Sequence, residues 1–243
     1  MPAMVRKNGL HPPFTVPVLL AWVGQATSFF ICGAVLYLLS ETWATVIAVL
    51  LMVSVTGLWF YVQGVDPAQP GGFPLPCFRT SQAKARYCAV CKKVVPGLDH
   101  HCPWLGHCVG TRNYLQFYLL SVMGWVCAAW QCVIGLYLVL DETSREQGIA
   151  RAQGSKTTFA AILGVHFLCS VIILSSYISL WAFHTYLLYI GKGTYMYMID
   201  QSNARRGLGQ ATKAAKPSAT APANQESTQG ASAEQEHVDS SPV

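Results

Sequence analysis

Charged side chains are scarce in this chain of 243 residues. Asp, Glu, Lys and Arg make up only 11% of the sequence, whereas apolar residues make up 52%. Soluble domains usually contain about a quarter charged residues. This shortage of charge excludes an ordinary soluble domain and is typical of a protein that lies in a membrane.

Four stretches contain no Asp, Glu, Lys or Arg at all: residues 14–39, 43–62, 114–140 and 159–190. About 20 apolar residues in a helix cross a bilayer, so each stretch is long enough. We predict four transmembrane helices rather than buried helices of a soluble core, which a chain of this size could not cover. Charged or repeatedly broken spans, which a transporter or channel would need, are lacking.

Lys and Arg are distributed unevenly around these stretches. Thirteen of the sixteen lie before the first stretch, between the second and third, or after the fourth. The other side has only Arg145, Arg151 and Lys156. The positive-inside rule therefore predicts that both termini and the loop between the second and third stretches are cytosolic. A reducing cytosol favours metal-bound or reactive cysteines over disulfides.

That loop is rich in cysteine and histidine. The pattern Cys88-x2-Cys91-x9-His101-x6-Cys108 has the residue types and spacing of a tetrahedral zinc site. Ligands for one such site do not suffice for a RING-type ubiquitin ligase. The sequence therefore predicts a metal site that resembles a zinc knuckle.

Cys102 is left over from this set, and it follows Asp99 and His100 directly. Only a thiolate attacks an electrophile, so a nucleophilic cysteine needs a base and a group that orients the base. His100 can take the proton and Asp99 can hold its imidazole. Because neighbouring side chains point in different directions, His101 can face the metal while His100 faces Cys102.

This stretch resembles the cysteine-rich domain of the DHHC-type protein S-acyltransferases (palmitoyltransferases). Residues 99–104 read DHHCPW, and residues 108–117 read CVGTRNYLQF, similar to the family's CVGxxNYxxF. The resemblance implies an all-α polytopic membrane protein, with four transmembrane helices and a small cytosolic zinc-bound domain between the second and third. It also implies that Cys102 takes a palmitoyl group from palmitoyl-CoA and passes it to a cysteine of a protein substrate.

The resemblance further implies zinc as a structural ion and acyl-CoA as the co-substrate. The expected partners are the lipid bilayer and protein substrates with membrane-proximal cysteines, and no nucleic acid. The expected location is the endomembrane system, in the Golgi or ER, with the active site facing the cytosol. The expected parts are a cytosolic N-terminus (1–13), helices one and two (14–62), the zinc domain (63–113), helices three and four (114–190) and a cytosolic tail (191–243).

Two departures from the family pattern leave an alternative open. Family members hold a second zinc at positions that correspond here to Pro74, Cys77, Tyr87 and Val94. One cysteine does not make a site, so we predict a single zinc. The family's Thr-Thr-x-Glu string is Gly-Thr-Tyr-Met at residues 193–196. These losses favour a catalytically weak or inactive zinc-binding membrane adaptor, whereas the intact Asp99, His100 and Cys102 oppose it.

Polar residues inside the apolar stretches are His166, His184, Gln25 and Gln131. We expect hydrogen bonds between helices rather than a proton path. His107 could serve as a spare metal ligand. From Ser202 onward, large apolar residues are almost absent, which predicts disorder.

Small residues at positions 127–129 have two interpretations. At ~1.5 Å per helical residue, Cys127 lies roughly 20 Å below the start of its helix, about the length of a sixteen-carbon chain. The space beside these small side chains could hold a sixteen-carbon acyl chain and tolerate one of eighteen carbons. Alternatively, the small residues only allow close helix packing.

Overall fold

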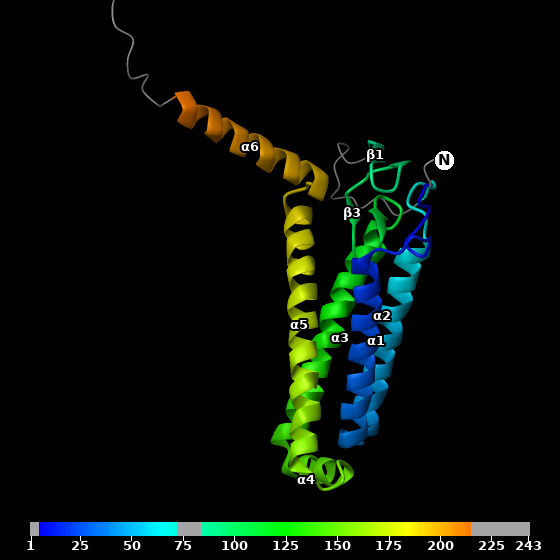
Figure 1. The fold of residues 1–243 in the computed structure, drawn as a ribbon, viewed down its shortest axis with the longest axis vertical. Coiled ribbons are helices and arrows are strands. Elements are labelled where there is room, and N and C mark those ends of the chain that lie inside the picture. The colour runs from blue at the N-terminus through cyan, green and yellow to red at the C-terminus, as the bar shows by residue number, and fades with distance from the viewer. Residues whose placement is uncertain (1–4, 72–83, 215–243) are drawn as a thin grey trace, which may run out of the picture. The chain divides into compact units, whose positions relative to one another are not determined.

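Four long helices dominate the protein, whose computed structural model describes residues 5–71 and 84–214. They are α1 (Val16–Leu39), α2 (Thr42–Gly64), α3 (Tyr114–Leu140) and α5 (Lys156–Tyr189). Each is long and apolar enough to cross a membrane, which confirms the predicted membrane fold. Within the compact unit that ends at Gln201, the four helices run side by side (Figure 1).

The outer faces of these helices carry large apolar side chains. Phe30 of α1 is 82% exposed and Leu168 of α5 is 64% exposed. In water such a surface would be an aggregation hazard. Lipid chains are as apolar as these side chains, so a bilayer covers them without cost.

Local chemistry sets where the helices begin. Pro17 lies in the first turn of α1, where its missing amide hydrogen breaks no helical hydrogen bond. The Ser155 side chain accepts a hydrogen bond from the amide of Thr158 and caps α5. Both starts fall within three residues of the predicted stretches.

A short helix that the sequence analysis did not predict, α4 (Glu142–Arg151), joins α3 to α5. Asp141 caps it by accepting from the amide of Ser144 at 2.8 Å. The Arg151 guanidinium donates to the carbonyl of Leu38 at 2.8 Å and so caps the last turn of α1. In Figure 1, α4 lies at the end of the bundle opposite to the β-strands.

Close contacts join α3 to α5 through two glycines. A Cβ atom on Gly124 would lie 2.4 Å from the ring of Tyr177, and one on Gly135 would lie 3.0 Å from His166. No side chain fits at Gly124 while Tyr177 stays in place. Small residues that let membrane helices approach closely are a common packing device.

A buried polar cluster connects three helices at this interface. The Gln131 side chain oxygen accepts from Ser28 of α1 at 3.2 Å and from Ser170 of α5 at 3.4 Å. His166 of α5 is hydrogen-bonded to the Gln131 carbonyl at 2.8 Å. The predicted hydrogen bonds between helices are therefore confirmed for Gln131 and His166.

The cysteine-rich domain consists of two short antiparallel hairpins. The first pairs β1 (Arg86–Cys88) with β2 (Lys93–Val95), and the second pairs β3 (His100–Cys102) with β4 (His107–Val109). These strands are the exception in a mostly helical fold. Each has three residues, which is too short for a periodic sequence pattern to indicate a strand.

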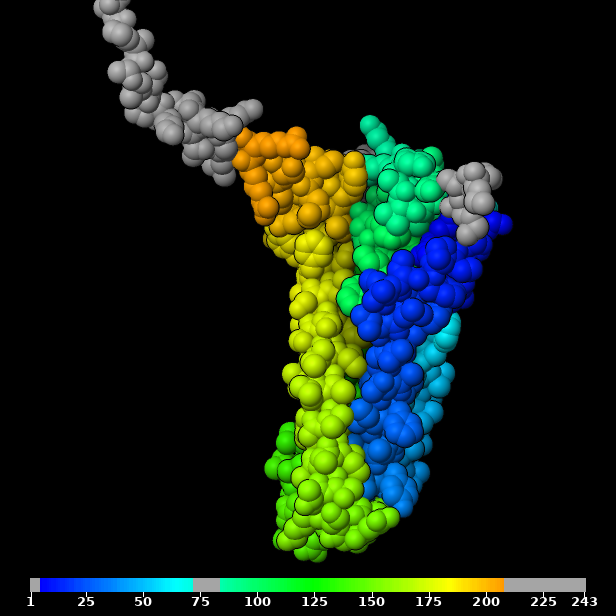
Figure 2. Space-filling model, in the orientation of Figure 1, coloured from blue at the N-terminus to red at the C-terminus, as the bar shows by residue number. Residues whose placement is uncertain are grey.

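The segment before α1 lies against this domain. Arg6 donates from its amide to the carbonyl of Cys91 and from its guanidinium to the carbonyl of Gly106. A Cβ atom on Gly9 would lie 2.1 Å from the carbonyl oxygen of Leu105, so only glycine fits there. Figure 2 shows this blue N-terminal segment beside the green domain at the same end of the bundle.

A partly buried ion pair also fastens the domain to the bundle. The Lys93 ammonium lies 2.6 Å from the Asp66 carboxylate, just beyond α2, and also donates to the carbonyl of Lys7. Burial would raise the pKa of Asp66, but hydrogen bonds from Lys93 and from the Ala68 amide lower it below its usual value. The carboxylate is therefore held in its charged form.

The chain continues after α5 as α6 (Thr194–Ala214). The prediction of disorder from Ser202 onward is thus wrong as far as Ala214. Residues 202–214 include Ala, Arg and Gln, which favour helix. Residues 215–243 of the predicted tail lie outside the described residues.

Candidate metal centre and catalytic site

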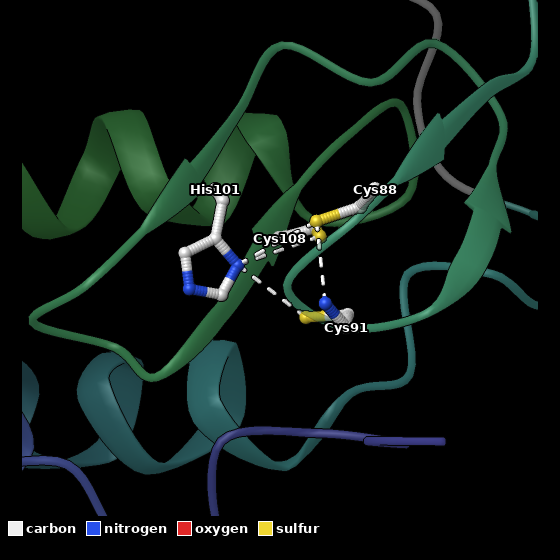
Figure 3. Close-up of side chains that lie close together, drawn as sticks. All are labelled: Cys88, Cys91, His101 and Cys108. Atoms are coloured by element: carbon white, nitrogen blue, oxygen red, sulfur yellow. Dashed lines mark hydrogen bonds between the residues drawn. The ribbon is translucent and has the colours of Figure 1, made fainter. Parts of the chain in front are cut away.

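The four predicted metal ligands come together between the two hairpins (Figure 3). Nδ1 of His101 lies 3.4 Å from the sulfur of Cys91 and 3.8 Å from those of Cys88 and Cys108. Zinc bonds of about 2.3 Å to sulfur and 2.0 Å to nitrogen put neighbouring ligand atoms roughly 3.5–3.8 Å apart. The donor set therefore fits one tetrahedral zinc ion.

The thiols of this group share their protons unequally. Hydrogen bonds from Cys108 and His101 lower the pKa of Cys91 to about 4, although burial opposes the shift. The contact with Cys91, together with burial, raises the pKa of Cys108. Metal-binding thiols must lose their protons, so a bound divalent cation would relieve this crowding and release protons.

Strand β3 directs its histidines to opposite sides. Successive strand residues point to opposite faces, so His101 turns to the cysteines while His100 shares a face with Cys102. His101 pairs with the ligand Cys108 across the hairpin. The predicted division between a metal-facing and a thiol-facing histidine agrees with this arrangement.

Asp99 is held by His100 and by the start of α6. Its carboxylate lies 2.8 Å from Nδ1 of His100 and accepts from the amide and hydroxyl of Thr194 at 2.9 and 2.7 Å. Asp99 is only 4% exposed. Burial would raise its pKa, but the bonds from His100 and Thr194 lower it. Asp99 is therefore a fixed anion that orients His100.

His100 has its second ring nitrogen left to face Cys102. Burial alone would lower the pKa of His100, but its contacts with Asp99 and Cys102 raise it to about 9. The Cys102 side chain is itself buried. The arrangement can therefore move a proton from the thiol to the imidazole and keep the resulting charge pair out of water.

The sequence analysis missed His184 as part of this site. His184 lies on α5, and its ring nitrogen is within 4.8 Å of Asp99 and His100 donor atoms. Its Nδ1 lies 3.0 Å from the hydroxyl of Tyr114, which confirms the expected interhelical bond. A histidine in an apolar span was the available signal, but nothing in the sequence connects it with residues so far away in the chain.

His107 is not a member of the metal group. It is fully buried, and the side chain of Asn113 lies 3.4 Å from its Nε2. Burial lowers the pKa of His107 to about 4. The geometry thus favours a packed neutral histidine over a spare ligand.

At the family's second zinc site, two of the four ligand positions lie within the described residues, and neither holds a metal ligand. Tyr87 and Val94 face each other across the first hairpin, and both are exposed. Pro74 and Cys77 lie outside the described residues. The single-zinc count therefore stays a prediction.

Arg86 contacts the position where the family's glutamate is lost. Its guanidinium lies 4.4 Å from the Tyr195 ring centroid and 3.4 Å from the sulfur of Met196. A cation over an aromatic face is attracted by the ring. The start of α6 is thus still in contact with β1.

Comparison with known proteins agrees with this geometry. The family described as DHHC palmitoyltransferase matches residues 72–201, more than half of the chain. The chain belongs to this family. The DHHC motif that names it contains Asp99, His100, His101 and Cys102.

Several curated proteins resemble this DHHC chain. The palmitoyltransferase ZDHHC9 of Danio rerio is 36% identical over 46% of this chain and 28% of its own length. The palmitoyltransferase ZDHHC18 of Homo sapiens is 39% identical over 43% of this chain and 26% of its own length. Protein S-acyltransferase 8 of Arabidopsis thaliana is 26% identical over 54% of this chain. The matched segments span less than a third of each relative.

Proposed function

We propose that this protein is a protein-cysteine S-acyltransferase that moves a palmitoyl group from palmitoyl-CoA to Cys102 and then to a cysteine of a protein substrate. The observation that carries the proposal is the Asp99–His100 pair beside a buried thiol that the metal group does not use. Membership of the DHHC palmitoyltransferase family supports it.

In the first step, His100 takes the proton of Cys102, and the thiolate attacks the carbonyl carbon of the acyl-CoA thioester. The bond between that carbon and the CoA sulfur breaks. The CoA sulfur leaves with the proton from His100. Cys102 then carries the acyl group as a thioester, and free CoA thiol is released.

In the second step, His100 takes a proton from the thiol of the substrate protein. The substrate sulfur attacks the Cys102 thioester, and the Cys102 sulfur leaves and regains the proton. Each step exchanges one thioester for another, so the transfer is nearly isoenergetic and reversible. Asp99, itself held by Thr194, keeps Nδ1 of His100 engaged throughout, so that the other nitrogen serves the reacting sulfur.

A long acyl chain suits the surroundings of Cys102. Cys102 belongs to a buried apolar cluster that also contains Phe117, Leu120 and Cys127 of α3. An acyl group on Cys102 would therefore enter the bilayer region along apolar side chains. This favours a fatty acyl-CoA over a small acyl donor.

We assign a single structural zinc to Cys88, Cys91, His101 and Cys108. The fit of the donor atoms to a tetrahedron supports the assignment. Bound zinc supplies folding energy to a domain whose own apolar core is small. With four protein ligands the ion would have no open position for a substrate.

We place the cysteine-rich domain and both termini in the cytosol, where acyl-CoA is made available. The excess of Lys and Arg on that side supports this orientation. For the cytosolic and membrane segments we propose the boundaries given in the sequence analysis. The endomembrane system, in the Golgi or ER, is the proposed location.

The test is a covalent acyl group on the purified protein. Incubation with alkyne-tagged palmitoyl-CoA should label the wild-type protein, and neutral hydroxylamine should remove the label because it cleaves thioesters. Cys102→Ser should remove the label. Cys132→Ser, which changes a cysteine within α3, should keep it.

A zinc-binding adaptor is the competing outcome of this experiment. It would give a folded, metallated wild-type protein without any label. The engaged Asp99–His100 pair and its bonds to Thr194 favour the enzyme, because an adaptor has no need of them.

A further inference from the structure

His184 and Tyr114 place a buried polar pair directly behind the Asp99–His100 dyad. The two side chains are 2% and 3% exposed, and their hydrogen bond of 3.0 Å joins α5 to α3. A buried imidazole needs a partner, because an unsatisfied polar group in an apolar region is costly. Tyr114 supplies that partner and fixes the orientation of the His184 ring.

The ring of His184 forms part of the wall around His100. The centroids of the two imidazoles are 5.6 Å apart. Phe117 lies edge-on to both rings, at 5.3 Å from His100 and 4.9 Å from His184. With Asp99 holding Nδ1, contact with these two rings restrains rotation of the His100 ring.

We infer that His184 is a positioning residue for the reaction proposed above, and that it acts through the Tyr114 hydroxyl bond. The pair holds the dyad in the orientation in which His100 faces Cys102. It also ties that orientation to the packing of the two membrane helices. His184 does not touch Cys102 or the acyl group in this role.

Donor atoms of Asp99, His100 and His184 also come close enough together to hold a metal ion. Both oxygens of Asp99, however, already accept hydrogen bonds from Thr194, and one also contacts His100. The contacts among these groups explain their proximity without an ion. The zinc content of the His184→Phe variant distinguishes a metal site from a hydrogen-bonded cluster.

The same helix pair offers a matched control one turn away. The Tyr118 hydroxyl of α3 lies 3.0 Å from the hydroxyl of Thr185 on α5 and accepts from Trp181. Tyr118→Phe removes a hydroxyl from the same interface without touching the dyad. Tyr114→Phe removes the hydroxyl that contacts His184, whereas Tyr118→Phe removes the hydroxyl that contacts Thr185.

The experiment measures the single-turnover acylation rate of Cys102 in the purified full chain, with palmitoyl-CoA as the probe at concentrations up to saturation. We expect Tyr114→Phe to lower the rate about fivefold, the size of one neutral hydrogen bond, with unchanged KM for palmitoyl-CoA. Tyr118→Phe should retain the wild-type rate. His184→Phe should be slower than His184→Asn, because the amide keeps a polar atom near Nδ1.

The double variant Tyr114→Phe/His184→Phe should be no slower than His184→Phe alone, since both changes remove the same hydrogen bond between Tyr114 and His184. Zinc content and thermal midpoint are measured for each variant. Equal rates for Tyr114→Phe and Tyr118→Phe would overturn the inference, and so would additive losses in the double variant. A zinc content that falls in His184→Phe would make His184 a ligand instead.

A second readout does not depend on acyl transfer. Alkylation of Cys102 by iodoacetamide at fixed pH, followed by peptide mass spectrometry, reports how well His100 serves the thiol. Tyr114→Phe should slow it and Tyr118→Phe should not. If this pattern holds while the wild-type protein takes up no palmitoyl group, the proposed function fails and the positioning role stands.

Discussion

Thr194 donates two hydrogen bonds to Asp99, one from its amide at 2.9 Å and one from its hydroxyl at 2.7 Å. Asp99 precedes α3 and Thr194 follows α5, so the two residues are 95 positions apart in the sequence. Through this contact the first residue of α6 fixes the carboxylate that orients His100. The single threonine retained from the family's Thr-Thr-x-Glu string therefore supports the proposed Asp99–His100 dyad.

Replacing Thr194 by Val should slow acylation of Cys102. Val keeps the shape and the amide donor but loses the hydroxyl, and a hydrogen bond to a charged group contributes enough for a change of about tenfold or more. The measurement is the single-turnover rate with palmitoyl-CoA. Thr194→Ser, which keeps the hydroxyl, should stay close to wild type; a similar loss in both variants would contradict the role of that bond.

Replacing His100 or Asp99 by Ala should slow acylation by more than about 100-fold, the low end for general acid–base catalysis. The cause is loss of the proton acceptor in one case and of its orientation in the other. Rates are measured on protein of confirmed zinc content. His11→Ala changes a half-buried histidine outside the site and should leave the rate intact. Activity that survives in His100→Ala would assign the base elsewhere.

Metal analysis should give about one zinc per chain, since the described residues hold one complete tetrahedral set of Cys and His ligands. Cys102→Ser should keep this zinc and the fold, whereas Cys91→Ala should lose both, because a structural ion supplies folding energy. Expression level and zinc content are the readouts. About two zinc ions per chain would show a second site, and zinc loss in Cys102→Ser would make Cys102 a ligand.

A glycosylation acceptor in an extended loop inserted at Gly154 should be modified. That position follows α4, at the end of the bundle far from the cysteine-rich domain. An acceptor placed in the tail should remain unmodified. The readout is an endoglycosidase-sensitive shift in mobility. The reverse pattern would put the cysteine-rich domain in the lumen, away from acyl-CoA.

Cys127→Trp tests how the acyl chain lies along α3. A bulky ring there should shift preference toward shorter acyl-CoA if the chain reaches this depth, as measured by competition between acyl-CoA donors. The close contact of Gly124 with Tyr177 of α5, within one turn of Cys127, supports the packing interpretation of the small residues. An unchanged chain-length profile with retained activity would leave packing as their only role.

Local spacing explains why the metal group and the dyad could be predicted from sequence. Cys88 and Cys91 lie three positions apart, and Asp99, His100 and Cys102 lie within four positions. Such residues meet whatever the rest of the chain does. The four spans were equally accessible, because a lipid environment demands long runs without charge.

The partners that come from far along the chain were not accessible in this way. Thr194 reaches Asp99, and His184 reaches Tyr114, only because α3 begins and α5 ends beside the second hairpin. Helix α4 was missed because it is short and polar, and its capping by Asp141 outweighs weak periodicity. The register of packed helices depends on contacts that no short motif encodes.

The docking of Arg6 and Gly9 has a consequence for biosynthesis. This segment leaves the ribosome before every residue that it binds, since its contacts include Cys91, Leu105 and Gly106. At ~5–20 residues per second, roughly 5–20 seconds pass before that hairpin has been made. Arg6 and Gly9 therefore reach their final places only after the hairpin that they contact has been made.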